Sequence, residues 1–166
     1  YVQRLILALE LDQTNLRQNM AYYDAVYEGA LQANALLRQS SQDPRALVIN
    51  AYRATEYFAE PGKRATWDAI VSSGDVGLLP TGVATSLTTY FGADTWISTR
   101  DAMLASPYRL RVRRTIAFEV QDAIRRGCSD ARDPATNGLR FMTECRLEGV
   151  SDAEIAAAAA ALRRNP

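Results

Sequence analysis

The fold depends first on residues 1–39, YVQRLILALELDQTNLRQNMAYYDAVYEGALQANALLRQ, a stretch without proline and with a single glycine, Gly29. Its apolar residues recur at steps of three and four, which is typical of a helix that buries one face. A continuous helix over this stretch would be about 57 Å long. We therefore expect a long N-terminal helix that continues another helix, pairs with one, or crosses a whole bundle. The apolar positions are Leu5, Leu9, Leu16, Met20, Tyr23, Tyr27, Leu31 and Ala35, with Asp12 on the same stripe.

The remaining sequence predicts shorter helices. Asp43 followed by Pro44 is a typical helix start, because the carboxylate caps free amides and proline lacks an amide that would go unbonded there. Gly74 is placed to end a helix. Residues 139–149 are compatible with a short helix or an extended segment, and that choice is open. We expect helices over residues 44–60, 66–73, 81–91, 93–105, 107–126 and 152–164, and a loop over residues 129–138.

No part of the chain alternates apolar and polar residues as a half-buried strand does. We therefore predict an all-α fold, a helical bundle with a long N-terminal helix, forming a single domain over residues 1–166. Residues 127–166 form its C-terminal tail region, which carries both cysteines. Within this tail, Ser151 and Glu154 have the spacing of a capping box at a helix start.

Two interpretations of Cys128 and Cys145 are open. They are either small buried side chains, as is common in the cytosol, or one disulfide formed in an oxidising compartment. We favour the disulfide, because both residues lie in the same tail and the segment between them is partly turn-like. Closing a loop of that length stabilises a fold by about 3 kcal/mol in the chain-entropy model. Two thiolates without histidine make a poor zinc site, so we expect no metal.

Composition and charge exclude several classes of protein. The 166 residues are 48% hydrophobic and 23% charged, which is an ordinary globular balance. Nineteen basic residues offset nineteen acidic ones, and the zero net charge argues against a nucleic-acid partner. The chain has no histidine, which excludes Ser-His-Asp catalysis and haem with a histidine ligand. With no catalytic motif present, we expect neither an enzyme nor a cofactor.

Two stretches resemble a group of uncharacterised bacterial single-span membrane proteins. In that group one membrane helix leads into a segment of the type YLxxLxxDLxxD, and residues 1–12, YVQRLILALELD, stand in this pattern. Residues 66–91, TWDAIVSSGDVGLLPTGVATSLTTYF, resemble the stretch "tW..l.ssG.l.li....l...l..YY" of the same group. Phe91 stands where a second tyrosine is usual. The matching residues are Tyr1, Leu5, Leu9, Asp12, Trp67, Ser73, Gly74, Leu78, Leu79, Leu87 and Tyr90.

This resemblance implies a helical domain held at a membrane by a helix that precedes Tyr1. A basic segment before the membrane helix stays in the cytoplasm. The resemblance therefore implies a place in the bacterial inner membrane, with the domain facing the periplasm and the membrane as a partner. It implies no known activity, and it covers about a quarter of the chain.

Four residues are candidates for ligand binding. Arg109 and Arg113 are four apart on a predicted helix and can form a fork for a carboxylate or phosphate. The alternative is a solvated face paired with nearby acids. Tyr23 and Trp67 are candidates for lining a pocket, although core packing is the commoner role of such aromatic residues.

The sequence therefore supports two functions that it cannot rank. The first is an extracytoplasmic, membrane-anchored domain that senses a ligand or relays a signal through its long first helix. The second is an envelope scaffold or oligomerisation module without a small-molecule ligand, with the apolar stripe of residues 1–39 as the seam of a homodimer or the contact to another envelope protein.

Overall fold

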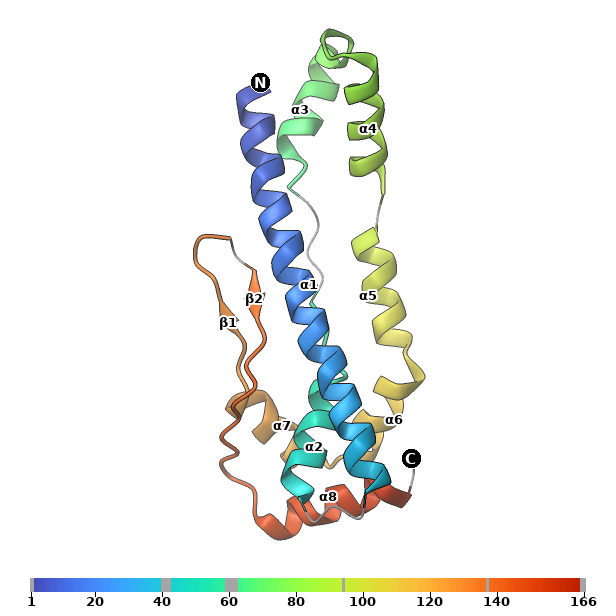
Figure 1. Cartoon of the computed structure of the whole chain (residues 1–166), viewed down its shortest axis with the longest axis vertical. Coiled ribbons are helices and arrows are strands. Elements are labelled where there is room, and N and C mark those ends of the chain that lie inside the picture. Colours follow the sequence, from blue (N-terminus) through green and yellow to red (C-terminus); the bar gives the residue numbers. More distant parts are fainter. Residues whose placement is uncertain (1, 40–42, 59–62, 94, 137, 165–166) are drawn as a thin grey trace.

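The computed structural model describes residues 2–39, 43–58, 63–93, 95–136 and 138–164. Its elements are α1 (Val2–Arg38), α2 (Pro44–Arg53), α3 (Ala65–Ser73), the 3₁₀ helix η1 (Asp75–Leu78), α4 (Thr81–Gly92), α5 (Thr95–Ala105), α6 (Pro107–Thr115), α7 (Phe118–Gly127), β1 (Ala131–Arg132), β2 (Leu139–Arg140) and α8 (Asp152–Arg164). The all-α fold with a long N-terminal helix is confirmed. The molecule is elongated, and α1 runs along most of its length (Figure 1).

The buried face of α1 follows the predicted apolar stripe only near its N-terminal end, where Leu5 and Asp12 are buried. Leu16, Met20, Tyr27 and Leu31 of that stripe are exposed. Tyr22 and Val26, each one residue before the predicted positions Tyr23 and Tyr27, are buried instead, and one residue along a helix is a turn of about 100°. This face packs on α2, where a Cβ added to Gly29 would lie in ordinary van der Waals contact, 3.7 Å from the Asn50 carbonyl oxygen. Its buried residues are Leu5, Asp12, Tyr22, Val26, Gly29 and Ala33.

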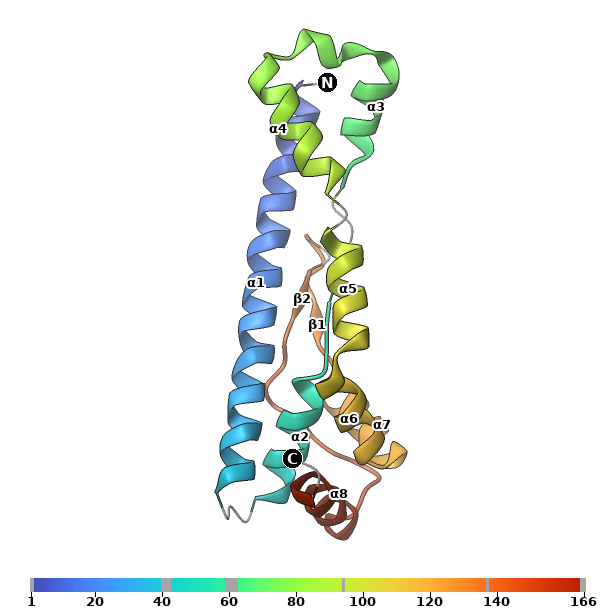
Figure 2. The same ribbon diagram turned by 90° about the vertical axis from the view of Figure 1, so that its right-hand side faces the viewer.

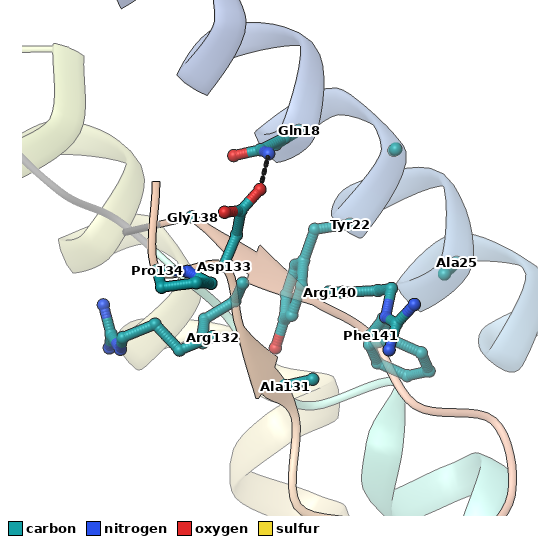
Figure 3. A pocket seen from close by; sticks show the side chains of 12 residues that line it. Gln18, Tyr22, Ala25, Ala131, Arg132, Asp133, Pro134, Gly138, Arg140 and Phe141 are labelled. Carbon is teal, nitrogen blue, oxygen red and sulfur yellow. Dashed lines mark hydrogen bonds between the residues drawn. The ribbon is translucent and has the colours of Figure 1, made fainter. Parts of the chain in front are cut away.

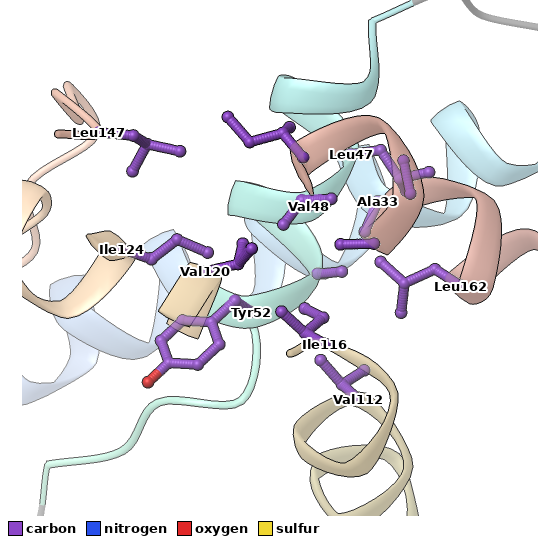
Figure 4. Packing of buried hydrophobic residues seen from close by; sticks show 14 of the residues in the cluster. Ala33, Leu47, Val48, Tyr52, Val112, Ile116, Val120, Ile124, Leu147 and Leu162 are labelled. Carbon is purple, nitrogen blue, oxygen red and sulfur yellow. The ribbon is translucent and has the colours of Figure 1, made fainter. Parts of the chain in front are cut away.

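Most of the buried apolar side chains gather around the C-terminal end of α1. Helices α1, α6, α7 and α8 surround the apolar face of α2 there (Figure 4). Leu47, Val48 and Tyr52 of α2 are fully enclosed, as is Ile124 of α7. We call this group the lower cluster, after its place in Figure 1. It consists of Ala33, Leu47, Val48, Ala51, Tyr52, Val112, Ile116, Val120, Ile124, Cys128, Leu147, Ile155, Ala158, Ala159 and Leu162.

A second, smaller core lies at the other end of α1, where α3, η1 and α4 fold over its first turns (Figure 2). We call it the upper cluster, and its buried residues are Leu5, Trp67, Ile70, Leu87 and Phe91. The Trp67 and Phe91 rings are stacked, with centroids 5.7 Å apart. Beside this cluster Asp12 is buried and accepts hydrogen bonds from the Lys63 amide, at 3.2 Å, and from the Tyr90 hydroxyl, at 3.4 Å.

Helix α2 starts as predicted but ends early. The Asp43 carboxylate accepts a hydrogen bond from the Ala46 amide at 2.8 Å, which confirms the cap. The predicted continuation is wrong over residues 54–58, because the helix ends at Arg53, and residues 59 and 60 lie outside the described residues. The Thr55 amide and hydroxyl both donate to the Tyr52 carbonyl, at 2.9 and 2.6 Å. Such local bonds compete with helical ones and close the last turn.

The predicted helix over residues 107–126 is in fact two helices, α6 and α7. Ile116 and Ala117 between them have extended backbone, and Ile116 is buried. The Gln121 side-chain amide donates to the carbonyls of Arg113 and Ile116, both at 2.7 Å. The bend thus places Ile116 in the lower cluster, while Gln121 satisfies the carbonyls at the helix end.

The C-terminal tail is held in three ways. Strands β1 and β2 form a short antiparallel hairpin, which corrects the expected loop over residues 129–138, and residues 141–149 form neither helix nor strand. The disulfide between Cys128 and Cys145 is confirmed, with Cα atoms 4.5 Å apart. The capping box is also confirmed, with the Glu154 carboxylate accepting from the Ser151 amide at 2.7 Å.

Among the described residues, no helix combines the length and the apolar character needed to cross a bilayer.

Candidate functional site

A cleft of about 450 Å³ lies between the middle of α1 and the hairpin (Figure 3). That volume is in the range of small-molecule sites. Its walls come from segments more than a hundred residues apart in the chain, so no single stretch of sequence describes it. The lining residues are Gln18, Ala21, Tyr22, Ala25, Ala131, Arg132, Asp133, Pro134, Gly138, Leu139, Arg140 and Phe141.

The side chain of Gln18 joins the hairpin to α1 by hydrogen bonds at one end of the cleft. Its side-chain amide donates to Asp133 at 2.9 Å, and its carbonyl oxygen accepts from the Thr136 hydroxyl at 2.6 Å. The hairpin approaches so closely that a Cβ added to Gly138 would lie 2.0 Å from Gln18 Oε1. Hydrogen bonds from the Ala135 amide and Gln18 lower the pKa of the Asp133 carboxyl, so it is ionised at neutral pH. The helix side of the cleft is open because Ala21 and Ala25 are small.

At the other end of the cleft lies a buried ionic cluster. The Tyr22 hydroxyl donates to Asp130 at 3.2 Å, and Asp130 forms an ion pair with Arg53 of α2. Arg53 also pairs with Glu56, donates to the Met142 carbonyl at 3.0 Å, and is itself buried. We call Tyr22, Arg53, Glu56 and Asp130 the ionic cluster. It joins α1, α2 and the segment that leads into the hairpin.

The ionic cluster perturbs two of its own groups. Burial raises the pKa of Glu56 to about 7, although the positive charge of Arg53 opposes that change. Burial, together with the negative charges of Asp130 and Glu56, raises the pKa of Tyr22 far above its usual value. Tyr22 is therefore a hydrogen-bond donor at every pH at which the protein folds, and Glu56 changes charge near neutral pH.

Aromatic rings complete the contact between the cleft and the cluster. The Tyr22 and Phe141 rings meet edge to face, with centroids 5.4 Å apart, and both line the cleft. The Arg53 guanidinium lies 3.8 Å from the centre of the Phe141 ring, on which it stacks. A molecule in the cleft that contacts Tyr22 or Phe141 therefore contacts a side chain that in turn touches Asp130 or Arg53.

The predicted arginine pair lies together, but outside the cleft. Arg109 donates to the Thr55 carbonyl, and Arg113 Nε donates to the Thr55 hydroxyl at 2.7 Å. Arg113 also stacks on the Tyr52 ring at 3.6 Å from its centre, and burial lowers the pKa of its guanidinium. The two arginines therefore lie together, and their guanidinium groups donate hydrogen bonds to Thr55 just after the C-terminal end of α2.

The two aromatic candidates also lie elsewhere. Trp67 is buried in the upper cluster against Phe91. Tyr23 is half-buried, and its hydroxyl donates to the Phe58 carbonyl at 2.8 Å. Neither side chain lines the cleft beside the hairpin.

Sequence reasoning missed the residues that the structure brings together. Tyr22 lies beside the predicted stripe of α1 and not on it, and nothing in the sequence marks Gln18 or Arg53, which are common surface residue types. The available signal was the turn-rich stretch from Asp133 to Gly138, which suits a hairpin. In the described part of the chain, no group of three or more acidic or cysteine side chains is placed to hold a metal ion.

Comparison with known proteins adds no relative. No protein-family model, no curated protein and no solved structure matches this chain. The resemblance to the single-span membrane proteins therefore stays a prediction, and the role of the cleft has to be argued from its own residues.

Proposed function

We infer that this chain is a ligand-sensing helical domain, held outside the bacterial cytoplasm by a membrane helix that precedes it. In this proposal the hairpin cleft is the ligand site and α1 relays its occupancy. The anchor and the compartment are supported by the resemblance of residues 1–12 and 66–91, and an oxidising compartment suits the disulfide.

The position of Tyr22 carries the sensing role. Its ring is part of the cleft wall, and its hydroxyl bonds to Asp130 of the ionic cluster. A ligand that moves this ring changes the hydrogen bond to Asp130, and with it the ion pair to Arg53 of α2. A relay requires a side chain that contacts both the ligand site and the group that responds, and Tyr22 contacts both the cleft and the ionic cluster.

The length of α1 supports the relay. The same helix contributes Leu5 to the upper cluster and Ala33 to the lower cluster, with the cleft between them. A helix of 37 residues without a break passes a displacement at its middle to both ends. A short or broken first helix would not have this property.

The experiment has two stages. Thermal unfolding of the oxidised chain against a broad metabolite library identifies ligands. A ligand at a hundred times its dissociation constant adds about 2.7 kcal/mol, or roughly 5–10 °C in melting temperature for a domain of this size. Hydrogen exchange of α2 amides is then measured with and without the strongest ligand. We expect the ligand to slow exchange in α2, although α2 does not line the cleft.

A pair of neighbouring tyrosines provides the control. Tyr22→Phe keeps the ring in the cleft and removes the bond to Asp130, so it should bind the ligand and lose the effect on α2. Tyr23→Phe removes a hydroxyl bonded to Phe58 and should behave as the unmodified chain does. A library without any ligand, or an α2 response that survives Tyr22→Phe, would contradict the proposal.

A second function is favoured by the exposed stripe of α1. Leu16, Met20 and Tyr27 are exposed and follow one another at steps of four and seven, as d, a and a positions of a two-helix seam do, and the exposed Leu31 lies one residue past the next d position. We propose self-association through this stripe as the alternative, with a second copy of the chain as the partner.

Sedimentation tests this alternative. A chain that pairs through the stripe should dimerise with rising concentration, and Met20→Asp should leave it monomeric. Leu78→Asp is the matched control, because Leu78 is even more exposed than Met20, at 82% against 67%, and lies on η1 away from the stripe. A strict monomer at high concentration would end this alternative.

A further inference from the structure

Part of the cleft lining is apolar. Ala21 and Ala25 lie one helical turn apart on the same face of α1, so their small side chains leave room opposite the hairpin. The rings of Tyr22 and Phe141, together with Leu139, provide apolar walls. Aromatic and aliphatic walls of this kind favour a planar apolar body in the ligand.

The charges in the cleft are unequal. Its lining carries two guanidinium groups, of Arg132 and Arg140, and one carboxylate, of Asp133. The Asp133 carboxylate is already held by Gln18 and the Ala135 amide. The cleft therefore has one positive charge in excess.

Arg140 is the cation available to a ligand. It lies on the hairpin wall of the cleft, beside Phe141 (Figure 3). Its side chain is exposed and has no ion pair or hydrogen bond with the described part of the chain. Arg132, by contrast, lies 5.9 Å from the centre of the Phe58 ring. A guanidinium binds a planar carboxylate through two parallel hydrogen bonds.

We propose that the cleft binds a small monocarboxylate with a planar apolar body, its carboxylate on Arg140 and its body against Tyr22 and Phe141. This proposal rests on the proposed function, because it names the ligand class of the same cleft. The Asp133 carboxylate opposes a second negative charge on the ligand, so phosphorylated compounds and dicarboxylates fit less well.

The test compares matched probes by titration calorimetry. Benzoate, phenylacetate and indole-3-acetate are the monocarboxylates, and benzamide and phenyl phosphate are their neutral and dianionic counterparts. We expect at least one monocarboxylate to bind at least about tenfold more tightly than both counterparts, as suits a hydrogen bond to a charged group.

Two variants locate the binding. Arg140→Gln should weaken monocarboxylate binding by about tenfold or more and abolish the preference over benzamide. Arg146→Gln is the matched control, because Arg146 is an exposed arginine of the same tail that does not line the cleft, and it should leave both unchanged. Ala21→Trp fills the cleft and should abolish binding of every probe, with folding checked by its melting temperature.

The outcomes separate the two proposals. Equal affinity for acid and amide, tighter binding of phenyl phosphate, or an Arg140→Gln variant that still prefers the acid would overturn the ligand class. If a library compound of another class then binds and Ala21→Trp blocks it, the sensing function stands. If no compound responds to Ala21→Trp, both proposals fail.

Discussion

The two ends of the molecule are built differently although one helix runs through both. The lower cluster draws on α1, α2, α6, α7 and α8, and the disulfide and the ionic cluster lie against it. The upper cluster, at the opposite end of the molecule, has five buried side chains and contacts neither the disulfide nor the ionic cluster. Local stability follows buried apolar contact. The lower end should therefore be the stable base, and the upper end the part that opens first.

The largest expected effect is in the lower cluster. Leu47 is fully buried among several helices, so Leu47→Ala leaves a cavity that its neighbours cannot fill. We expect a loss of about 3–5 kcal/mol in the free energy of unfolding, measured by urea titration with circular dichroism. A loss below about 1 kcal/mol would mean that the lower cluster is loosely packed.

Reduction of the disulfide comes next. The bond between Cys128 and Cys145 joins the end of α7 to the segment after the hairpin. Replacing both cysteines with serine should cost about 3 kcal/mol, seen as a lower melting temperature of the lower end. Reductant should lower the melting temperature of the unmodified chain and leave that of the double variant unchanged. A reductant effect in the double variant would point to some other cause.

The ionic cluster makes the lower end sensitive to pH. The folded pKa of Glu56, about 7, lies above its ordinary value of 4.5, so the folded state holds the proton more tightly. Its contribution to stability is complete below pH 4.5 and is lost as the pH rises through 7. The free energy of unfolding should fall by on the order of 3 kcal/mol across this range of pH.

Melting temperatures measured across that pH range check this prediction. Glu56→Gln cannot titrate and should flatten the fall. Glu28→Gln, at an exposed position of α1, should leave it in place. Stability that rises with pH through this window in the unmodified chain would contradict the assignment.

A matched substitution in the upper cluster should have a much smaller effect on the whole molecule. Ile70 is as buried as many lower-cluster residues, so Ile70→Ala also creates a cavity. We expect faster hydrogen exchange in α3 and α4, and a change below about 1 kcal/mol in the unfolding of the lower end. An effect equal to that of Leu47→Ala would show that the two ends unfold as one unit.

The smallest effect should be at the hairpin. A Cβ on Gly138 meets the tip of the Gln18 side chain, which can move away, whereas a Cβ on Gly127 meets the Arg146 carbonyl at 2.0 Å. Gly138→Ala should therefore cost about 1 kcal/mol or less and speed exchange only in the hairpin. Gly127→Ala should cost several times more. Equal costs would mean that the hairpin is held more rigidly than Gln18 alone explains.

Much of the secondary structure was predictable from the sequence, because local signals decide it. Asp43, Gly74 and the pair Ser151 and Glu154 begin or end helices as expected. The rest of the buried face of α1 was not predictable from apolar spacing, because it consists of Tyr22, Val26, Gly29 and Ala33, of which only Val26 is strongly apolar. Tertiary contacts overrode the local pattern there.

The candidate site was much less predictable than the fold. The cleft exists only because the hairpin lies against α1, and the ionic cluster depends on a buried arginine, Arg53, at a helix end. Arginines at helix ends usually face solvent, so the sequence contains no sign of its burial. Arg109 and Arg113 both donate to Thr55, a partner that their four-residue spacing does not indicate.

The disulfide also has a topological consequence. Cys128 and Cys145 close the hairpin into a covalent ring, with Arg132 and Arg140 exposed on it. A single tryptic cut inside the ring therefore releases no fragment, whereas a cut after Lys63 does. Nicked chains migrate with intact ones until a reductant separates the pieces. Electrophoresis with and without reductant thus distinguishes cutting at the cleft from cutting elsewhere. Protection of Arg132 and Arg140 from trypsin then shows whether the cleft is occupied.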